Sequence, residues 1–202
     1  MSLTRILMAF ALFSGLCQSM PAARAEIQQA AAAGYIRALF DANMAAGADT
    51  ARICPEIADL GRFAAGHAWQ ELSSNERRRF AVGFCDLAAE AVSRLRKRWP
   101  DLHLVIERTA DGPQDMQVVS GLVRQPNGVS WPVEWAVASE GDRAPHLADL
   151  KIVGVSLGIF LRSVALLQQD STARGAVTAH QLIAAWRRAL DRALPSATTP
   201  ED

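Results

Sequence analysis

Residues 103–153 read HLVIERTADGPQDMQVVSGLVRQPNGVSWPVEWAVASEGDRAPHLADLKIV, and the pattern within them sets the architecture of the chain. Apolar and polar residues alternate there with a period of two, which is the period of a half-buried β-strand. The alternation predicts strands at residues 103–108, 116–124, 131–137 and 147–153. Hairpin-type turns separate them at Asp111-Gly112-Pro113, Asn127-Gly128 and Gly141-Asp142. We therefore expect a four-stranded antiparallel meander with one apolar face.

Helical patterns flank this segment on both sides. Before it, a first helix is expected from Glu26 to about Ala46, and a second from about Pro55 to Trp69. Ser73-Ser-Asn-Glu76 has the pattern of a capping box and predicts the start of a third helix, which ends before Pro100. The apolar stripe of this third helix consists of Phe80, Phe84, Leu87, Ala91 and Leu95.

After the strands, two more helices are expected at residues 156–169 and 178–194. Helices that are segregated against one face of an antiparallel sheet make an α+β fold. We therefore predict an α+β protein in which N- and C-terminal helices wrap a twisted four-stranded sheet.

The N-terminus has the pattern of a secretory signal. Arg5 is a positive n-region, residues 6–16 form a short apolar stretch, and Ala23-Arg24-Ala25 is a small-x-small cleavage site. We interpret residues 1–25 as a cleaved leader, residues 26–194 as one domain and residues 195–202 as a disordered tail. Cys17 is assigned to the leader, because the residue before a lipidated cysteine is normally small and here it is Leu16.

The charge and composition exclude some partners. The chain has 21 basic and 21 acidic residues, and removal of Arg5 and Arg24 with the leader leaves a formal charge of −2. A near-neutral domain has no electrostatic basis for binding nucleic acid. Half of the residues are apolar and only one is Tyr, which favours an aliphatic interior over a carbohydrate-binding groove.

Two cysteines, Cys54 and Cys85, remain in the mature chain. If the second and third helices form a hairpin, both lie of order 20 Å from its turn, because a helix rises 1.5 Å per residue. In an oxidising compartment they are expected to pair; the alternative is two unpaired, buried small residues. No metal site is expected, because there is no CxxC and the histidines are scattered singly.

One short motif has the letters of a catalytic site. Gly154-Val-Ser156-Leu-Gly158 matches the nucleophile elbow of hydrolases, which in those enzymes follows a parallel strand. Here the preceding strand is antiparallel, so Ser156 is interpreted as a helix N-cap. We expect no catalytic residues, no cofactor and no enzymatic activity. A small α+β pocket enzyme for a hydrophobic substrate is the alternative.

Two blocks of sequence carry a resemblance to a known family. They are Ala65-Gly66-His67-Ala68-Trp69 with Glu76-Arg77-Arg78, Phe80 and Phe84 behind it, and Asp149 through Arg162. Together they resemble the MlaC (toluene-tolerance) family of periplasmic phospholipid-binding proteins. The resemblance implies an elongated apolar cavity between sheet and helices. It also implies a periplasmic carrier that shields lipid tails during transport between the inner and outer membranes. Such transport would serve the lipid asymmetry of the outer membrane. The resemblance further implies an inner-membrane ABC transporter complex with MCE domains and an outer-membrane lipoprotein complex as partners.

The cavity would be lined where the strand pattern and the helix stripe converge. The expected lining residues are Phe84, Leu87, Leu104, Ile106, Val118, Val133, Trp135, Ile152, Val155 and Phe160. Arg162 is expected either at the cavity mouth or in a salt bridge with Asp149, and Trp69 as an anchor of the hairpin. The ligand is expected to be a phospholipid or a related lipid, with another hydrophobic ligand such as a polycyclic lipid as the alternative.

Overall fold

An antiparallel sheet forms one layer of the structure, and its strands follow one another in sequence order. The computed structural model describes residues 20–44, 53–139, 144–171 and 177–194. The strands are β1 (His103–Asp111), β2 (Gln117–Arg124), β3 (Ser130–Ala138), β4 (His146–Ile152) and β5 (Val155–Ser156). The four predicted strands are confirmed, and β5 was missed because two residues are too short to show an alternation. The predicted turn at Gly141-Asp142 lies outside the described residues.

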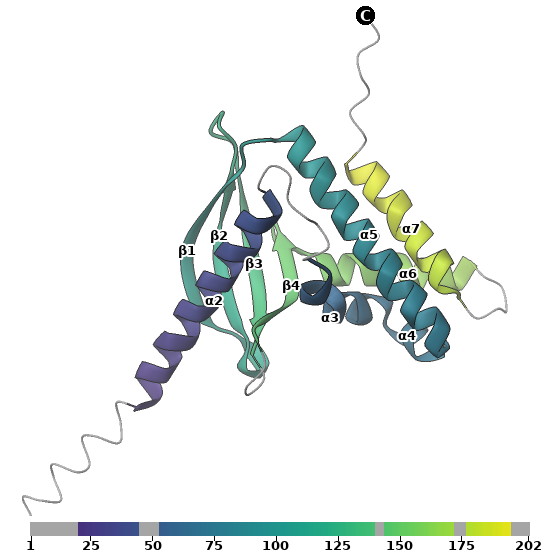
Figure 1. Cartoon of the computed structure of the whole chain (residues 1–202), viewed down its shortest axis with the longest axis horizontal. Coiled ribbons are helices and arrows are strands. Elements are labelled where there is room, and N and C mark those ends of the chain that lie inside the picture. The colour runs from purple at the N-terminus through teal and green to yellow at the C-terminus, as the bar shows by residue number, and fades with distance from the viewer. Residues whose placement is uncertain (1–19, 45–52, 140–143, 172–176, 195–202) are drawn as a thin grey trace, which may run out of the picture.

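Helices cover one face of this sheet and extend beyond it. They are α2 (Met20–Met44), α3 (Ile53–Ala65), α4 (His67–Glu71), α5 (Ser74–Arg98), α6 (Leu157–Ser171) and α7 (Ala179–Ala193), and the 3₁₀ turn η2 (Pro113–Asp115) joins β1 to β2. In Figure 1, α2 crosses the sheet at β1 and β2, whereas α3 and α6 pack against β4 and α5 lies beside α7. The arrangement is the predicted α+β fold.

One continuous core joins the two layers. Ala32 and Ile36 of α2 belong to the same buried cluster as Val119 and Trp135 of the sheet. At the centre of the helices, Trp186 has no exposed surface, and its ring lies 5.5 Å from that of Phe80 and 5.4 Å from that of Phe84. Its indole N–H donates a 2.8 Å hydrogen bond to the carbonyl oxygen of Leu161 in α6. This tryptophan therefore ties α5, α6 and α7 together.

Gly66 divides what was predicted to be one helix from residue 55 to residue 69. It has φ 57° and ψ −127°, a conformation that is open to glycine and strained for other residues. The chain consequently leaves α3 at Ala65 and starts the short α4 at His67. The prediction of a single helix was wrong, because the hydrophobic period continues across the glycine while the backbone does not.

Half of the predicted capping box is present. The Ser73 hydroxyl accepts a hydrogen bond from the backbone N–H of Glu76 at 3.3 Å, as expected for an N-cap. The Glu76 carboxylate does not return to Ser73 but accepts the backbone N–H of Ala179 at 3.0 Å. Glu76 thus lies at the positive end of α7 and joins α5 to a helix that begins far along the chain.

A β-bulge bends β1. Ile106 pairs with Gly121 and Arg108 with Ser120, so Glu107 is the extra residue. A Cβ atom on Gly121 would lie 2.3 Å from the carbonyl oxygen of Val105, and therefore only glycine fits opposite the bulge. The bulge reverses which side chains of β1 face the helices beyond this point.

The hairpin between β4 and β5 contains a strained residue. Val153 has φ 51° and Gly154 has φ 79°, and the two form the turn between the paired residues Ile152 and Val155. Positive φ is unusual for a β-branched residue and costs on the order of 1–3 kcal/mol. The backbone N–H of Val153 donates to the carbonyl oxygen of Pro132 at 2.9 Å, which holds the turn against β3.

Within the part of the chain that the structure describes, no helix is long and apolar enough to cross a membrane. Residues 1–19 of the predicted leader and the predicted tail at 195–202 lie outside the described residues.

Candidate functional site

Six of the ten residues predicted to line a cavity lie in the core, four of them on the inner face of the sheet, turned toward the helices, and two on α5. Phe84, Leu87, Leu104, Val133 and Trp135 are buried in the common core, and Ile106 packs against it. The structure thus brings these side chains together at the seam between sheet and helices. In the described residues they belong to one connected cluster of buried side chains.

Val118 lies on the other face of the sheet, so its predicted position was wrong. It pairs with Ala136, whereas the buried Val119 pairs with Trp135, and successive residues of a strand face opposite sides. On that outer face Val118 borders a shallow hollow with Glu134, Ala136, Asp149 and Lys151. The error arose because β2 has apolar residues in both parities.

Ile152, Val155 and Phe160 were predicted to line the cavity, but the structure leaves them at the surface. They are 45 %, 60 % and 40 % exposed. Ile152 and Val155 lie at the β4–β5 hairpin, and Phe160 follows in the first turns of α6. Their apolar character fits the strand and helix pattern, but the helices do not extend over this end of the sheet.

A hollow opens between α3 and α5, on the side of the helices where the two cysteines meet. Its volume is about 170 Å³. It is lined by Cys54, Ala58, Arg62, Trp69, Phe80, Ala81, Phe84 and Cys85. Phe80 and Phe84 are buried and form its floor, while the small side chains of Ala58 and Ala81 leave it open. Apart from Arg62, the lining is apolar, as required for a hydrocarbon chain.

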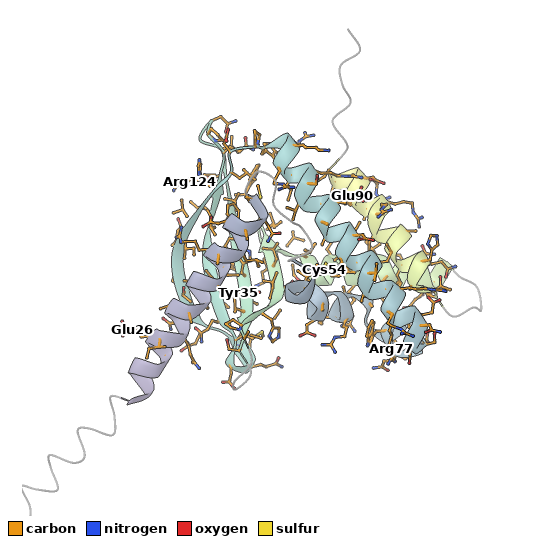
Figure 2. All side chains as sticks on the ribbon, in the orientation of Figure 1. Glu26, Tyr35, Cys54, Arg77, Glu90 and Arg124 are labelled. Atoms are coloured by element: carbon orange, nitrogen blue, oxygen red, sulfur yellow. A yellow bond between two sulfur atoms is a disulfide. The ribbon has the colours of Figure 1, made fainter. Side chains whose placement is uncertain are left out.

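A disulfide closes one end of this hollow. Cys54 and Cys85 are joined, with 5.0 Å between their Cα atoms. Figure 2 places Cys54 at the start of α3, where α3 approaches α5. The covalent bond fixes the separation of the two helices at this end.

Trp69 lies at the other end, where it anchors the α4–α5 corner. Its ring meets Phe80 edge to face at 5.5 Å, and the Arg77 guanidinium lies 5.4 Å from its centre. The Arg77 Nε donates to the Trp69 carbonyl oxygen at 3.1 Å. Trp69 therefore both anchors the hairpin, as predicted, and borders the hollow.

Arg162 contacts the Gly66 corner. Its guanidinium lies 5.3 Å from the centre of the Phe63 ring, and a Cβ atom on Gly66 would approach its Nε to 3.3 Å. The predicted alternative, a salt bridge with Asp149, is not formed: the Asp149 carboxylate accepts the backbone N–H of Gly158 instead, at 3.0 Å. Arg162 thus ties α6 to α3 through packing.

Ser156 is the N-cap of α6, as predicted. Its hydroxyl oxygen accepts the backbone N–H of Ile159 at 3.1 Å, and Asp149 satisfies the neighbouring N–H of Gly158. The two side chains together satisfy two of the four free N–H groups at this helix start. The hydroxyl that would act in a nucleophile elbow is thereby bound to the backbone of its own helix.

We expect Ser156→Ala to lower the free energy of unfolding by about 1 kcal/mol, the usual loss for an N-cap. Urea denaturation of the purified protein measures it. Ser163→Ala is the matched control, because Ser163 is exposed and its hydroxyl only donates to the Phe160 carbonyl oxygen within the same helix. Equal losses in the two variants would contradict a specific cap.

A polar contact ties α2 to the sheet. The buried Gln117 donates to the Asp111 carboxylate at 3.0 Å, and Gln29 of α2 donates to the same oxygen at 3.3 Å. These bonds, chiefly the one from Gln117, hold the pKa of Asp111 below its ordinary value. A lowered pKa means that the contact favours the folded state above the unfolded pKa and is lost as the pH falls through the folded value.

Among the described residues, no three His, Cys, Asp or Glu side chains lie close enough to hold a metal ion. The arrangement that remains is an apolar one: a seam between sheet and helices, and a hollow beside it.

Comparison with known proteins places this arrangement in a family. Residues 23–165 match the family described as the MlaC protein. No curated protein matches the chain. Among solved structures, the phospholipid-binding protein from Ralstonia solanacearum, determined in complex with a phospholipid, is similar with a TM-score of 0.57 at 14 % identity, over 83 % of this chain and 98 % of that one. At this identity the likeness shows a shared fold. Because the family match spans well over half of the 202 residues, this chain belongs to the MlaC family.

Proposed function

We propose that this protein binds a phospholipid or a related lipid and carries it through water, with the acyl chains entering the hollow between α3 and α5. The observation that carries the proposal is an apolar hollow floored by Phe80 and Phe84 in a member of the MlaC family. The Ralstonia solanacearum protein, which binds a phospholipid and shares the fold, supports it.

Such a carrier lowers the free energy of moving a lipid through water. Each methylene exposed to water costs about 0.8 kcal/mol, so a lipid with two long chains cannot leave a bilayer unaided at a useful rate. An apolar lining that replaces the bilayer around the chains removes most of this cost. No covalent chemistry is needed, and we propose that the protein is not an enzyme.

The hollow must enlarge to accept a whole lipid. Its 170 Å³ is below the roughly 300–1,000 Å³ of most pockets for organic ligands. We propose that it deepens toward the sheet through displacement of core side chains, because one connected cluster of buried side chains runs from Phe84 to the inner face of the sheet. Leu87, Leu104, Ile106, Val133 and Trp135 would then face the chains, as the sequence predicts.

We propose further that the protein works in the periplasm, between an inner-membrane MCE-domain transporter and an outer-membrane lipoprotein complex. The proposal is supported by family membership, by the leader pattern in residues 1–25 and by the disulfide, which suits an oxidising compartment. Cleavage after Ala25 would shorten α2, which starts at Met20, and leave Glu26 as the first residue.

Native mass spectrometry of protein purified from the periplasm tests these proposals together. We expect one lipid per chain. After denaturation, the intact mass should be that of a chain that begins at Glu26, less the two hydrogen atoms that are lost when the disulfide forms. A chain that carries no lipid when purified without detergent and then incubated with phospholipid vesicles would overturn the carrier.

Filling the mouth of the hollow should reduce lipid binding. Ala81 is exposed at the rim, and Ala81→Leu places a branched side chain over Phe80 and Phe84. We expect the fraction of lipid-bound protein to fall about tenfold, a change of about 1.4 kcal/mol in binding free energy. Val82→Leu, one residue away and outside the hollow, is the control and should retain its lipid. Equal lipid content in both variants would place the chains elsewhere.

A further inference from the structure

The β4–β5 hairpin and the start of α6 expose a group of apolar side chains that the hollow does not use. We call it the hairpin surface. It consists of Phe63, Ile152, Val153, Val155, Ile159 and Phe160, each between 40 % and 63 % exposed. A solvated helix side is normally polar, and soluble monomers seldom expose such clusters unless they bind something. Leu166 and Leu167 continue the exposed apolar side along α6.

The hairpin surface is contiguous. Ile152 and Val155 are cross-strand partners, so their side chains are neighbours on one side of the hairpin. Val155 leads directly through Ser156 into α6. On the opposite flank, a Cβ atom on Gly158 would lie 3.0 Å from the Phe63 ring, which places α3 against the first turn of α6. The hairpin, α6 and α3 therefore present their apolar side chains together.

The tip of the hairpin keeps an apolar residue against backbone preference. A turn with positive φ at both central positions favours Asn, Asp or Gly, yet Val153 occupies the first position at φ 51° and is 58 % exposed. Strain of this kind persists where a function requires it. An exposed valine at the tip of a tight turn can be buried in an apolar medium without any change in the rest of the fold.

The charge that borders the hairpin surface is positive. Arg162 is exposed, its guanidinium lies 5.3 Å from the centre of the Phe63 ring, and among the described residues no carboxylate lies within ion-pair distance of it. The nearest charged groups are engaged elsewhere: Lys151 pairs with Glu134, Arg62 with Asp59, and Asp149 caps α6. The N–H groups of a guanidinium form a planar fork that matches the spacing of phosphate oxygens.

From these observations we propose that the hairpin surface docks on the surface of a phospholipid bilayer, with the apolar side chains entering the headgroup region and Arg162 contacting lipid phosphate. A protein interface carries about one hydrogen bond per 100–200 Å², whereas the six side chains of the hairpin surface are hydrocarbon without donors or acceptors; the flanking Lys151 and Arg62 already pair with Glu134 and Asp59, and the Ser163 hydroxyl bonds within its own helix. Hydrocarbon needs no such partners. The docking does not depend on lipid entering the hollow.

Vesicle flotation tests the docking. The purified protein is mixed with vesicles of phosphatidylglycerol and phosphatidylethanolamine in a 1:3 ratio, because anionic lipid attracts basic side chains. The fraction of protein that floats with the vesicles is measured. We expect Val153→Asn to reduce binding about fivefold and Phe160→Ser about tenfold. Val153→Asn is informative because it relieves backbone strain, so its thermal midpoint should rise while its binding falls. Val82→Asn, at an equally exposed valine on α5, should bind as the wild type does.

Arg162 is tested with a matched arginine. Arg162→Gln should remove the preference for anionic vesicles over phosphatidylcholine vesicles, whereas Arg78→Gln, at an arginine on α5 away from the hairpin surface, should keep it. Equal loss in both variants would overturn the role of Arg162.

Two further results would overturn the docking itself. One is unchanged vesicle binding of folded Val153→Asn and Phe160→Ser. The other is a wild type that ignores vesicles but sediments as a dimer that Phe160→Ser dissociates, since a second copy would then cover the surface. Lipid found by native mass spectrometry in a protein that fails to bind vesicles would leave the carrier intact and remove only the docking.

Discussion

Trp186→Ala is expected to lower the free energy of unfolding by about 3–5 kcal/mol, the usual cost of removing a large buried aromatic side chain. Trp186 is fully buried, contacts the rings of Phe80 and Phe84, and donates its indole N–H to Leu161. Its removal leaves a cavity between α5 and α7 and deletes one hydrogen bond to the Leu161 carbonyl oxygen in α6. Most proteins are stable by only about 5–15 kcal/mol, so the variant should lose a large share of its stability.

Two variants separate the contributions. Trp186→Phe keeps an aromatic ring but loses the hydrogen bond, and should cost less than Trp186→Ala, with about 0.5–1.5 kcal/mol from the lost bond. Trp99→Ala is the matched tryptophan control: Trp99 is only partly buried and contacts Trp131 at a ring distance of 5.0 Å. Urea unfolding followed by far-UV circular dichroism ranks the three. A Trp99→Ala variant as unstable as Trp186→Ala would show that Trp186 is not the centre of the helical core.

Removing the disulfide should have the second largest effect. The bond between Cys54 and Cys85 spans a sequence separation of 31, and closing a loop of this length restricts the unfolded chain by about 3–4 kcal/mol. We expect the double variant Cys54→Ala/Cys85→Ala to lose about this much stability relative to the oxidised protein, measured by urea unfolding. Reduction of the wild type with dithiothreitol should give a similar loss.

The reduced wild type is also the control for the two alanines, because it removes the bond without changing the side chains. Alkylation of the non-reduced, denatured mature protein should modify no cysteine, since Cys17 belongs to the predicted leader. Two modified thiols per chain, or a double variant as stable as the oxidised protein, would show that the bond does not form in the cell.

The sequence predicts the layers of this fold well because their signals are local. The alternation in residues 131–137 and the spacing of Phe80, Phe84 and Leu87 each report one element, and the structure confirms both. The N-cap role of Ser156 is likewise a local pattern. What depends on distant partners was missed: the Glu76 carboxylate reaches Ala179, which no capping pattern within α5 contains.

The faces of the strands were harder to predict than the strands themselves. In β2 the inner face holds Gln117, Val119 and Gly121, and the outer face holds the equally apolar Val118. Because the inner face includes a polar residue and a glycine, the alternate residues that face outward are the more hydrophobic set, and the prediction placed that set inside. Gly121 is there because of the bulge in β1, and a bulge in one strand leaves no periodic signal in its neighbour.

The sequence predicted the apolar character of the candidate site better than it predicted where each of its side chains lies. Apolar periodicity marks side chains that avoid water, but it does not distinguish a packed core from a cavity wall or from a surface that another body covers. Phe84 lines the hollow, Leu104 belongs to the core, and Phe160 is exposed, although all three follow the same kind of pattern. Only the positions of the helices separate these cases.

The bulge at Glu107 also affects the tendency of the protein to aggregate through the edge of its sheet. Among the described strands β1 has a neighbour on one side only, so about every second one of its nine residues leaves its backbone N–H and C=O groups open along the edge of the sheet. An edge of this length can recruit another chain and start aggregation. The bulge interrupts the row of open groups, and the charged pair Glu107 and Arg108 would have to lose water for a new strand to bind there. The same irregularity that reverses the faces of β1 therefore disfavours the addition of a strand from another molecule at this edge.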